Sequence, residues 1–230
     1  MPVVSPVSDR TTTVCLLLLT FATGIVDAIS VLVLGHVFVA NMTGNIIFLG
    51  FWFAPGTVVD MTAALVAFLS FVSGAMIGGR LSRHLDDDVR RWLTVALGTE
   101  VVMLATLSIL SGTGVLDYRD NTKLILIAGL AVTFGVQAAT ARQFGIQELS
   151  TTVLTTTIVG IGFDSRVAGG AGHREKLRYS VVLTMCAGAL VGATLTRWFV
   201  APVIAISAVV VAVAAGVFRF GPPNSGQAGG

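Results

Sequence analysis

Polar residues gather in one short stretch of an otherwise apolar chain, FVANMTGN, from Phe38 to Asn45. Asn41, Thr43 and Asn45 supply two side-chain amides and a hydroxyl, which can both donate and accept hydrogen bonds. Such groups could hold a neutral or ionic solute, although Asn and Thr also mediate plain packing between membrane helices. We predict that Asn41, Thr43, Gly44 and Asn45 contribute to a solute-binding site.

Two acidic side chains lie within long apolar runs and could couple transport to an ion. Asp27 precedes the FVANMTGN stretch, and Glu100 is the one acid in the run 92–111. A bare carboxylate at the bilayer centre costs roughly 2.5–3.5 kcal/mol on insertion scales, so such residues face inward, are paired or are protonated. We predict a proton- or cation-coupling role for Asp27 and Glu100. The alternative for each is a structural hydrogen bond to a neighbouring helix.

The composition places these residues in a membrane protein. The 230 residues are 54% hydrophobic and only 11% charged, whereas soluble domains have roughly 25% charged residues. We expect a single membrane domain over residues 1–230, with flexible polar tails at 1–12 and 221–230. The first apolar run has no convincing cleavage site before Asp27, so we interpret it as an uncleaved membrane helix.

Eight apolar segments must be arranged across the bilayer, and two of them differ from the rest. The segments are 13–35, 37–54, 61–80, 92–111, 122–140, 150–163, 179–199 and 200–218. A helix needs about 20 residues to cross about 30 Å of hydrocarbon. Segment 37–54 is interrupted by polar residues, and segment 150–163 is short and rich in Ser and Thr. We predict an all-α transmembrane bundle of about six crossings, with these two segments broken or re-entrant.

The distribution of Lys and Arg favours this arrangement. If all eight segments crossed, the two sides of the membrane would receive similar numbers of basic residues. If 37–54 and 150–163 return to the side they came from, one side receives only Arg119, Lys123 and Arg197. The other side receives Arg10, Arg80, Arg83, Arg90, Arg91, Arg142, Arg166, Arg174, Lys176, Arg178 and Arg219. By the positive-inside rule this basic side, with both termini, is cytoplasmic.

The chain also resembles itself, which predicts two halves at 13–111 and 122–218. SGAMIGGRLSRHL, residues 73–85, aligns with AGALVGATLTRWF, residues 187–199. The identical pairs are Gly74 and Gly188, Ala75 and Ala189, Gly78 and Gly192, Leu81 and Leu195, and Arg83 and Arg197. Weaker matches pair Gly24 with Gly135, Ala28 with Ala139, Thr43 with Thr155, and Gly50 with Gly162. The alternative is chance similarity between apolar helices.

Three crossings in each half would insert the second half upside down, as in many transporters built from inverted repeats. The counterpart of the FVANMTGN stretch is then 151–157, and we add Thr151, Thr152 and Thr155 to the predicted solute site. Gln137, one position from the counterpart of Asp27, joins them. Non-helical backbone at membrane depth must face protein or a water-filled cavity. We therefore expect the two segments to face each other across such a cavity.

No enzyme motif is present: Gly-x-Ser-x-Gly, His-Glu-x-x-His, a Walker loop and Cys-x-x-Cys are all missing from the sequence. Cys15 and Cys186 lie in apolar runs and are interpreted as small hydrophobic residues. We expect no enzymatic activity, cofactor, metal or nucleic-acid partner. The expected partners are the lipid bilayer and a small molecule or ion. The Gly-xxx-Gly faces at Gly74 and Gly188 serve packing either within one chain or in a homo-oligomer.

TGIVDAISVLVLGHVFVANMTGN, which contains Asp27 and the FVANMTGN stretch, resembles the first-helix region of the YoaK-like bacterial membrane proteins. Their pattern is Gly-x-x-Asp-Ala followed by Phe-x-Ala-Asn-Met-Thr-Gly-Asn. FGVQAATARQFG and STTVLTTT are similar to two further motifs of that family, and the resemblance spans essentially the whole chain. This sequence departs from the family pattern at Ala138, usually Asn, and at Thr156, usually Gly.

The resemblance implies a multi-pass protein of the bacterial inner membrane and suggests a small-molecule transporter. ANMTGNIIFLG also has a weak similarity to the Asn-x-x-Gly run of small fluoride channels. Three functions are open at this point. The first is a secondary transporter for a small molecule or ion, with its site between two broken helices at the midplane. The others are a passive channel and a non-transporting membrane scaffold.

Overall fold

A computed structural model describes residues 5–54, 56, 58–85, 88–144, 154–171 and 174–222. All the regular elements in these ranges are helices. In chain order they are α1 (Asp9–Val33), α2 (Met42–Gly50), α3 (Met61–His84), α4 (Val89–Gly112), α5 (Lys123–Gln143), α6 (Leu154–Phe163), the 3₁₀-helix η2 (Arg166–Ala168), α7 (Glu175–Thr196) and α8 (Ala201–Phe220). The predicted all-α fold is confirmed.

Several long helices begin at a side chain that caps them. The Ser8 hydroxyl accepts a hydrogen bond from the Thr11 amide, and Asp60 and Asp88 do the same for α3 and α4. A cap satisfies one of the amide groups left open in the first turn of a helix. Because Ser8 starts α1 at Asp9, part of the predicted tail 1–12 is helical.

Six of the helices are long and apolar enough to cross a bilayer, namely α1, α3, α4, α5, α7 and α8. This confirms the predicted six crossings by length and composition. α2 and α6 have 9 and 10 residues, so each extends for only about 15 Å at 1.5 Å per residue and is too short to span hydrocarbon. Whether they dip into the membrane stays a prediction.

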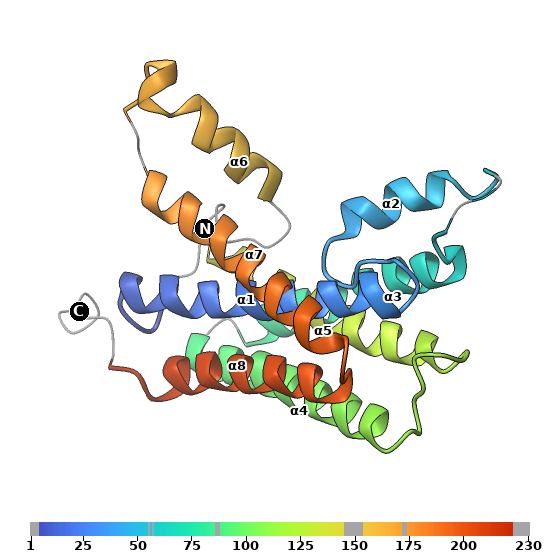
Figure 1. Cartoon of the computed structure of the whole chain (residues 1–230). Helices are drawn as coiled ribbons and strands as arrows, with labels where there is room; N and C mark the ends of the chain where they lie inside the picture. Colours follow the sequence, from blue (N-terminus) through green and yellow to red (C-terminus); the bar gives the residue numbers. More distant parts are fainter. Residues whose placement is uncertain are drawn as a thin grey trace.

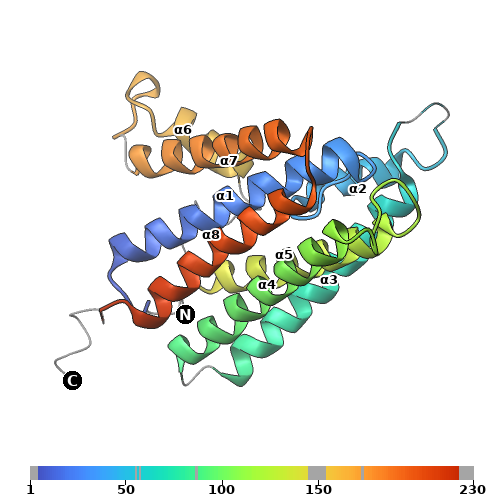
Figure 2. The same ribbon diagram turned by 60° about the horizontal axis from the view of Figure 1, so that its bottom comes forward.

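The long helices form a ring of four with one helix added at each edge. α1, α5, α4 and α8 contact one another in that order and close the ring, while α3 packs on α5 and α7 packs on α1. Figure 2 shows α7 beside α1 at one edge of the bundle and α3 at the opposite edge. The core of buried Leu, Ile, Val, Ala and Phe side chains lies between these helices.

The contacts between helices keep the same pattern when the two halves are exchanged. If α1 to α4 correspond to α5 to α8 in order, the α1–α7 contact corresponds to α5–α3, and α1–α8 corresponds to α5–α4. The α2–α3 contact corresponds likewise to α6–α7, and α4–α8 corresponds to itself. The two halves of the predicted repeat therefore pack largely against each other and less within themselves. The repeat itself stays a prediction.

Glycines allow close approach of the backbones at two contacts between the halves, α1 with α7 and α3 with α5. A Cβ on Gly24 would lie 2.5 Å from the Met185 carbonyl oxygen and 3.2 Å from the Gly188 carbonyl carbon. At the other contact a Cβ on Gly74 would overlap the Val132 backbone, and one on Gly135 would lie 3.1 Å from the Gly74 carbonyl carbon. The Gly-xxx-Gly faces thus contact helices of the same chain, and the aligned glycines meet in two equivalent pairs.

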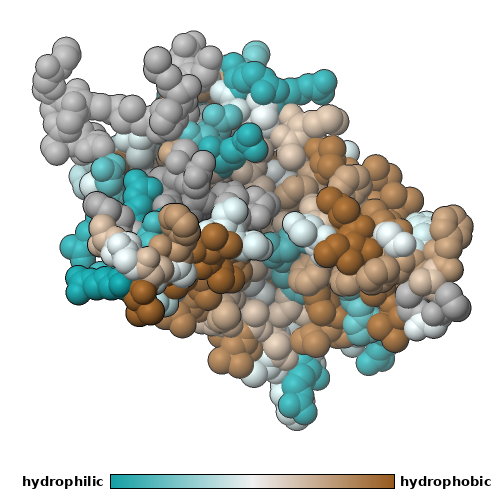
Figure 3. Space-filling view, turned by 90° about the horizontal axis from the view of Figure 1, so that it is seen from above, coloured by the Kyte–Doolittle hydropathy of each residue, from teal (hydrophilic) through white to brown (hydrophobic). Residues whose placement is uncertain are grey.

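The short helices lie on one face of the bundle, with α2 toward one end and α6 toward the other (Figure 1). Apolar side chains gather over the α2 region of this face (Figure 3). They include Ile46, Ile47, Trp52 and Phe53, the last of which is 95% exposed. In a membrane protein such a surface contacts lipid, because hydrocarbon chains replace water as its neighbour.

The glycine contacts predict opposite effects for two similar substitutions. Gly74→Ala places a methyl group against the Val132 backbone, and overpacking of this kind costs about 1–3 kcal/mol. Gly98→Ala in α4 meets no atom within 4 Å and gains up to about 1 kcal/mol of helix propensity. Thermal unfolding in detergent should therefore show a lower melting temperature for Gly74→Ala only. Equal melting temperatures for the two variants would contradict the close packing.

An ion pair beside the α2–α3 connection predicts a pH effect. Asp60 accepts a hydrogen bond from Lys123 at 2.8 Å and caps Ala63 at 3.0 Å. Partial burial acts to raise the pKa of Asp60, but the Lys123 bond and charge and the Ala63 amide lower it more, so its pKa lies below its ordinary value.

The stabilisation from a lowered carboxyl pKa is present above the unfolded pKa of about 3.9 and is lost as the pH falls through the folded value. We expect Asp60→Asn to be less stable than the native chain at pH 7, by up to about 1 kcal/mol, and to lose less stability between pH 5 and 3. Melting temperatures over this range test the prediction, with Lys123→Gln as the matched change to the partner. Parallel curves for native protein and Asp60→Asn would refute it.

Candidate solute and coupling site

Asp27 binds the backbone of the segment that joins α1 to α2. Its Oδ1 atom accepts hydrogen bonds from the amides of Val39 and Ala40, both at 2.9 Å, and its Oδ2 atom accepts one from the Asn41 side-chain amide. The carboxylate is 5% exposed. Three donors satisfy its two oxygens. Asp27 thus supplies the acceptor for the Val39 and Ala40 amides, which lie between α1 and α2 and have no helical partner.

Asn45 binds the same segment from the α2 side. Its side-chain carbonyl accepts from the Phe38 amide at 2.9 Å, and its side-chain amide donates to the Phe38 carbonyl at 2.6 Å. Both peptide groups of Phe38 are thereby paired. The Phe38 ring stacks on Phe48 and fills the space where a Cβ on Gly44 would be, 2.5 Å from the ring.

The structure thus brings Asp27, Asn41, Gly44 and Asn45 together, but it pairs their polar groups with one another and with the backbone. Thr43 differs, because its side chain is exposed on α2 and makes no hydrogen bond with the described residues. The cluster that the FVANMTGN stretch and Asp27 form is a folded backbone turn with one free hydroxyl.

The predicted counterpart in the second half is described only in part. Thr151 and Thr152 lie outside the described residues, and Thr155 is exposed on α6. α6 is held to α7 by Arg178, which donates to the Gly160 carbonyl at 2.7 Å and pairs with Asp164. Thr43 lies on α2, which packs on α3, and Thr155 lies on α6, which packs on α7. The two hydroxyls are therefore on separate short helices and do not form one compact cluster.

Glu100 has an environment opposite to that of Asp27. It lies near the middle of α4 and is 1% exposed, and neither of its carboxylate oxygens has a hydrogen-bond partner in the described part of the chain. The buried face of α4 packs against α5 and α8, so the carboxyl group lies inside the ring of four helices. A charged carboxylate without donors is strongly unfavourable in such surroundings.

Contacts along α4 show which residues lie at the level of Glu100. Leu107 of α4 would contact a Cβ on Gly129 of α5 at 2.8 Å, and the rings of Trp92 and Phe144 lie 6.2 Å apart. Because the two helices run antiparallel between these points, Glu100 lies opposite the turn that contains Gln137. On the α8 side, Ser108 donates to the Ala201 carbonyl at 2.7 Å and Arg90 to the Arg219 carbonyl at 3.2 Å. The same reasoning places Glu100 level with the buried Ser207.

Gln137 links this level to α1. Its side-chain amide donates to the Thr23 hydroxyl at 3.0 Å, while its side-chain carbonyl is buried and has no hydrogen-bond partner among the described residues. An unpaired acceptor on α5 and an unpaired carboxyl group on α4 therefore lie at about the same depth.

Sequence reasoning missed the other members of this level. Ser207 is the one hydroxyl of α8, and Thr23 is one of several in α1, so nothing in the spacing of either residue marks it. Recognising Thr23 requires the pairing of α1 with α5, which a single sequence does not provide. Within the described residues no three His, Cys, Asp or Glu side chains lie close enough together to hold a metal ion.

The bonds of Asp27 predict a graded loss of stability. Asp27→Ala leaves the Val39 and Ala40 amides without their acceptor, at about 1–3 kcal/mol for each unsatisfied group. Asp27→Asn keeps an oxygen for these amides but turns an NH₂ group toward that of Asn41. Adding Asn41→Asp restores a donor and an acceptor there, so the swapped pair should recover part of the lost melting temperature.

Thermal unfolding in detergent provides the measurement, with Asp9→Asn as the control because Asp9 is an exposed acid on the same helix. A melting temperature of Asp27→Ala equal to that of Asp9→Asn would show that the turn does not depend on Asp27.

Comparison with known proteins agrees with this architecture. Residues 15–217 match the family described as "Protein of unknown function (DUF1275)". The chain is 32% identical over 195 residues to the UPF0700 transmembrane protein YoaK of Bacillus subtilis. The aligned region covers 79% of this chain and 82% of that relative. No solved structure matches the chain. The match over most of its length and the six apolar helices together show that the chain is a multi-pass membrane protein of the YoaK/DUF1275 family.

Proposed function

We propose that the protein is a secondary transporter for a small molecule or ion, and that Glu100 is its coupling group. The observation that carries the proposal is the buried Glu100 carboxyl group in the central helix ring, which has no hydrogen-bond partner among the residues that the structure describes. Ionisable residues at such depth are rare in membrane proteins, and they mark ion pathways and proton relays.

The contrast with Asp27 decides which acid we assign to coupling. A coupling carboxylate must exchange a proton or cation during each cycle, so its oxygens cannot all be used by fixed donors. Asp27 accepts from two backbone amides and Asn41, whereas both oxygens of Glu100 are unpaired among the described residues. We therefore assign Asp27 to the structure of the α1–α2 connection and Glu100 to ion coupling.

The exchangeable contact pattern supports an inverted repeat as the basis of the transport cycle. Contacts such as α1–α7 and α3–α5 correspond under exchange of the halves, and glycines lie at both. Transporters with inverted repeats alternate their access by moving one bundle against another around a central site. In this proposal α2 and α6 are the corresponding short elements toward the two ends of the bundle (Figure 1), and Thr43 and Thr155 are their solute-contacting hydroxyls.

We infer the orientation from the basic residues. α1 begins and α8 ends at the same end of the six long helices, together with Arg90, Arg91 and Arg219. The positive-inside rule assigns this end to the cytoplasm of a bacterial inner membrane. α6 is then the short helix of the cytoplasmic side, and α2 that of the outer side.

Transport by reconstituted protein tests the proposal. Liposomes with the native chain are given a panel of small labelled solutes under an inward proton gradient, and the accumulated solute is measured. Glu100→Gln has no titrating group, so it should reduce gradient-driven accumulation at least about tenfold while exchange of the same solute without a gradient remains. Glu175→Gln, an acid at the start of α7, should transport like the native chain.

Two results would overturn the proposal in different ways. Full accumulation by Glu100→Gln would remove Glu100 from coupling. Flux through the native chain that equilibrates the solute and ignores the gradient would identify a passive channel instead of a secondary transporter.

A further inference from the structure

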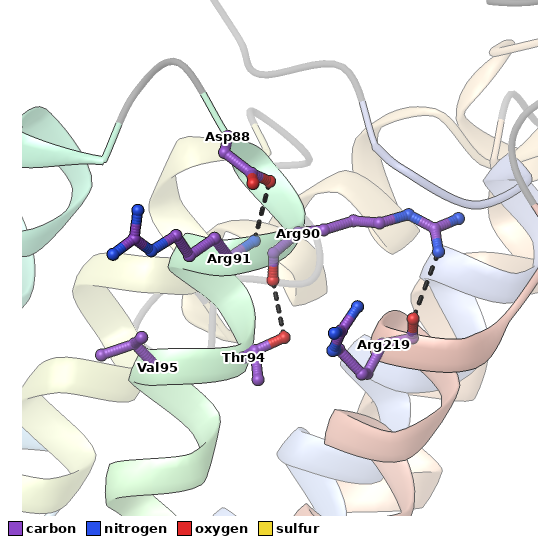
Figure 4. A pocket seen from close by; sticks show the side chains of 6 residues that line it. All are labelled: Asp88, Arg90, Arg91, Thr94, Val95 and Arg219. Atoms are coloured by element: carbon purple, nitrogen blue, oxygen red, sulfur yellow. Dashed lines mark hydrogen bonds between the residues drawn. The ribbon is translucent and has the colours of Figure 1, made fainter.

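A pocket of about 350 Å³, open on one side, lies where α4 begins and α8 ends. It is lined by Asp88, Arg90, Arg91, Thr94, Val95 and Arg219 (Figure 4). Three of these side chains are cationic and one is anionic. The pocket lies at the basic end of the bundle, where the chain leaves the apolar part of both helices.

Arg90 does not serve as a free charge here. Its guanidinium group donates to the carbonyl oxygens of Pro6 at 3.2 Å, Arg219 at 3.2 Å and Gly221 at 2.9 Å. Figure 4 shows it reaching from α4 toward the end of α8. Arg90 thus fastens the segments before α1 and after α8 to α4, and it forms a fixed wall of the pocket.

Arg91 and Arg219 are free to bind a ligand. Neither guanidinium group forms an ion pair or donates a hydrogen bond within the described ranges, which leave out Asp86 and Asp87. The Arg219 guanidinium carbon lies over the Phe220 ring, 5.8 Å from its centre, and this is its one contact of this kind in the described ranges. The Asp88 carboxylate is already used, since it accepts from the Arg91 backbone amide at 2.9 Å and caps α4. Guanidinium groups bind phosphate through paired N–H donors.

Apolar residues and glycines follow the pocket along both helices. On α4, Gly98 and the exposed Val102 follow Val95 at helical spacing, and on α8 Gly216 and the exposed Ala212 precede Arg219 in the same way. A Cβ on Gly98 or Gly216 would meet no atom within 4 Å. A ligand whose anionic head binds the arginines would have open space for apolar chains along these helices.

We propose that this pocket binds the headgroup phosphate of an anionic phospholipid. Basic pockets between transmembrane helices at the cytoplasmic side bind such headgroups in other membrane proteins. Inorganic phosphate also accepts hydrogen bonds from guanidinium groups, but it makes no use of the apolar surface beside Val95. The proposal does not depend on the transport function.

Native mass spectrometry of the full chain tests the proposal, with phosphatidylglycerol and phosphatidylcholine added in detergent. We expect phosphatidylglycerol to be retained and the double variant Arg91→Gln/Arg219→Gln to retain at least about fivefold less. The matched control, Arg83→Gln/Arg166→Gln, removes two exposed arginines from the same end of the bundle and should retain as much as the native chain. Without lipid, all three proteins should melt at similar temperatures, because the exchanged side chains make no hydrogen bond or ion pair with the described residues and only Arg219 has a ring contact there, with Phe220.

Three outcomes would overturn the assignment. Equal retention of phosphatidylglycerol by both double variants would show that the pocket is not its site. Equal retention of phosphatidylcholine by the native chain would show that the anionic headgroup is not recognised. A melting temperature raised by millimolar inorganic phosphate as much as by phosphatidylglycerol would assign the pocket to free phosphate.

Discussion

Hydrocarbon offers no hydrogen bonds, so every peptide group of a membrane chain must find its partner within the protein. The connection from α1 to α2 has a backbone that is not helical, so its peptide groups need partners other than those that a helix supplies. The Asp27 carboxylate accepts hydrogen bonds from the amides of Val39 and Ala40. The Asn45 side chain accepts a hydrogen bond from the Phe38 amide and donates one to the Phe38 carbonyl. The position of α2 depends on these bonds. Asp27 and Asn45, whose residue types suggest a solute-binding site, here form hydrogen bonds with the backbone.

A second constraint is the close approach of helices from different halves. Gly24 faces Gly188 and Gly74 faces Gly135, so α1 packs on α7 and α3 on α5. No hydrophobic force drives helices together within a membrane, so small residues stabilise their association by letting the backbones pack closely. The ring of α1, α5, α4 and α8 lies between these two contacts, and it encloses the level at which Glu100 and Gln137 are buried.

The sequence predicted the six long helices and the two short segments well, since helix length and apolar content follow directly from the hydrocarbon thickness. The aligned glycines were predicted as packing faces, and the structure supplies their partners. The bonds of Asp27 and Asn45 could not be predicted, because they depend on a turn whose geometry no residue pattern specifies. The environment of Glu100 was also beyond reach, since a carboxyl group buried with donors and one buried without them look the same in a sequence.

Arg90 has a consequence for the order in which the chain is completed. Its guanidinium group binds the carbonyl oxygens of Arg219 and Gly221, which are synthesised 129 and 131 residues after it. α1 is likewise synthesised before α7, the helix that covers Gly24. α1 and the start of α4 are therefore made before the segments that pack on them, and these contacts form only once α7 and α8 have been synthesised.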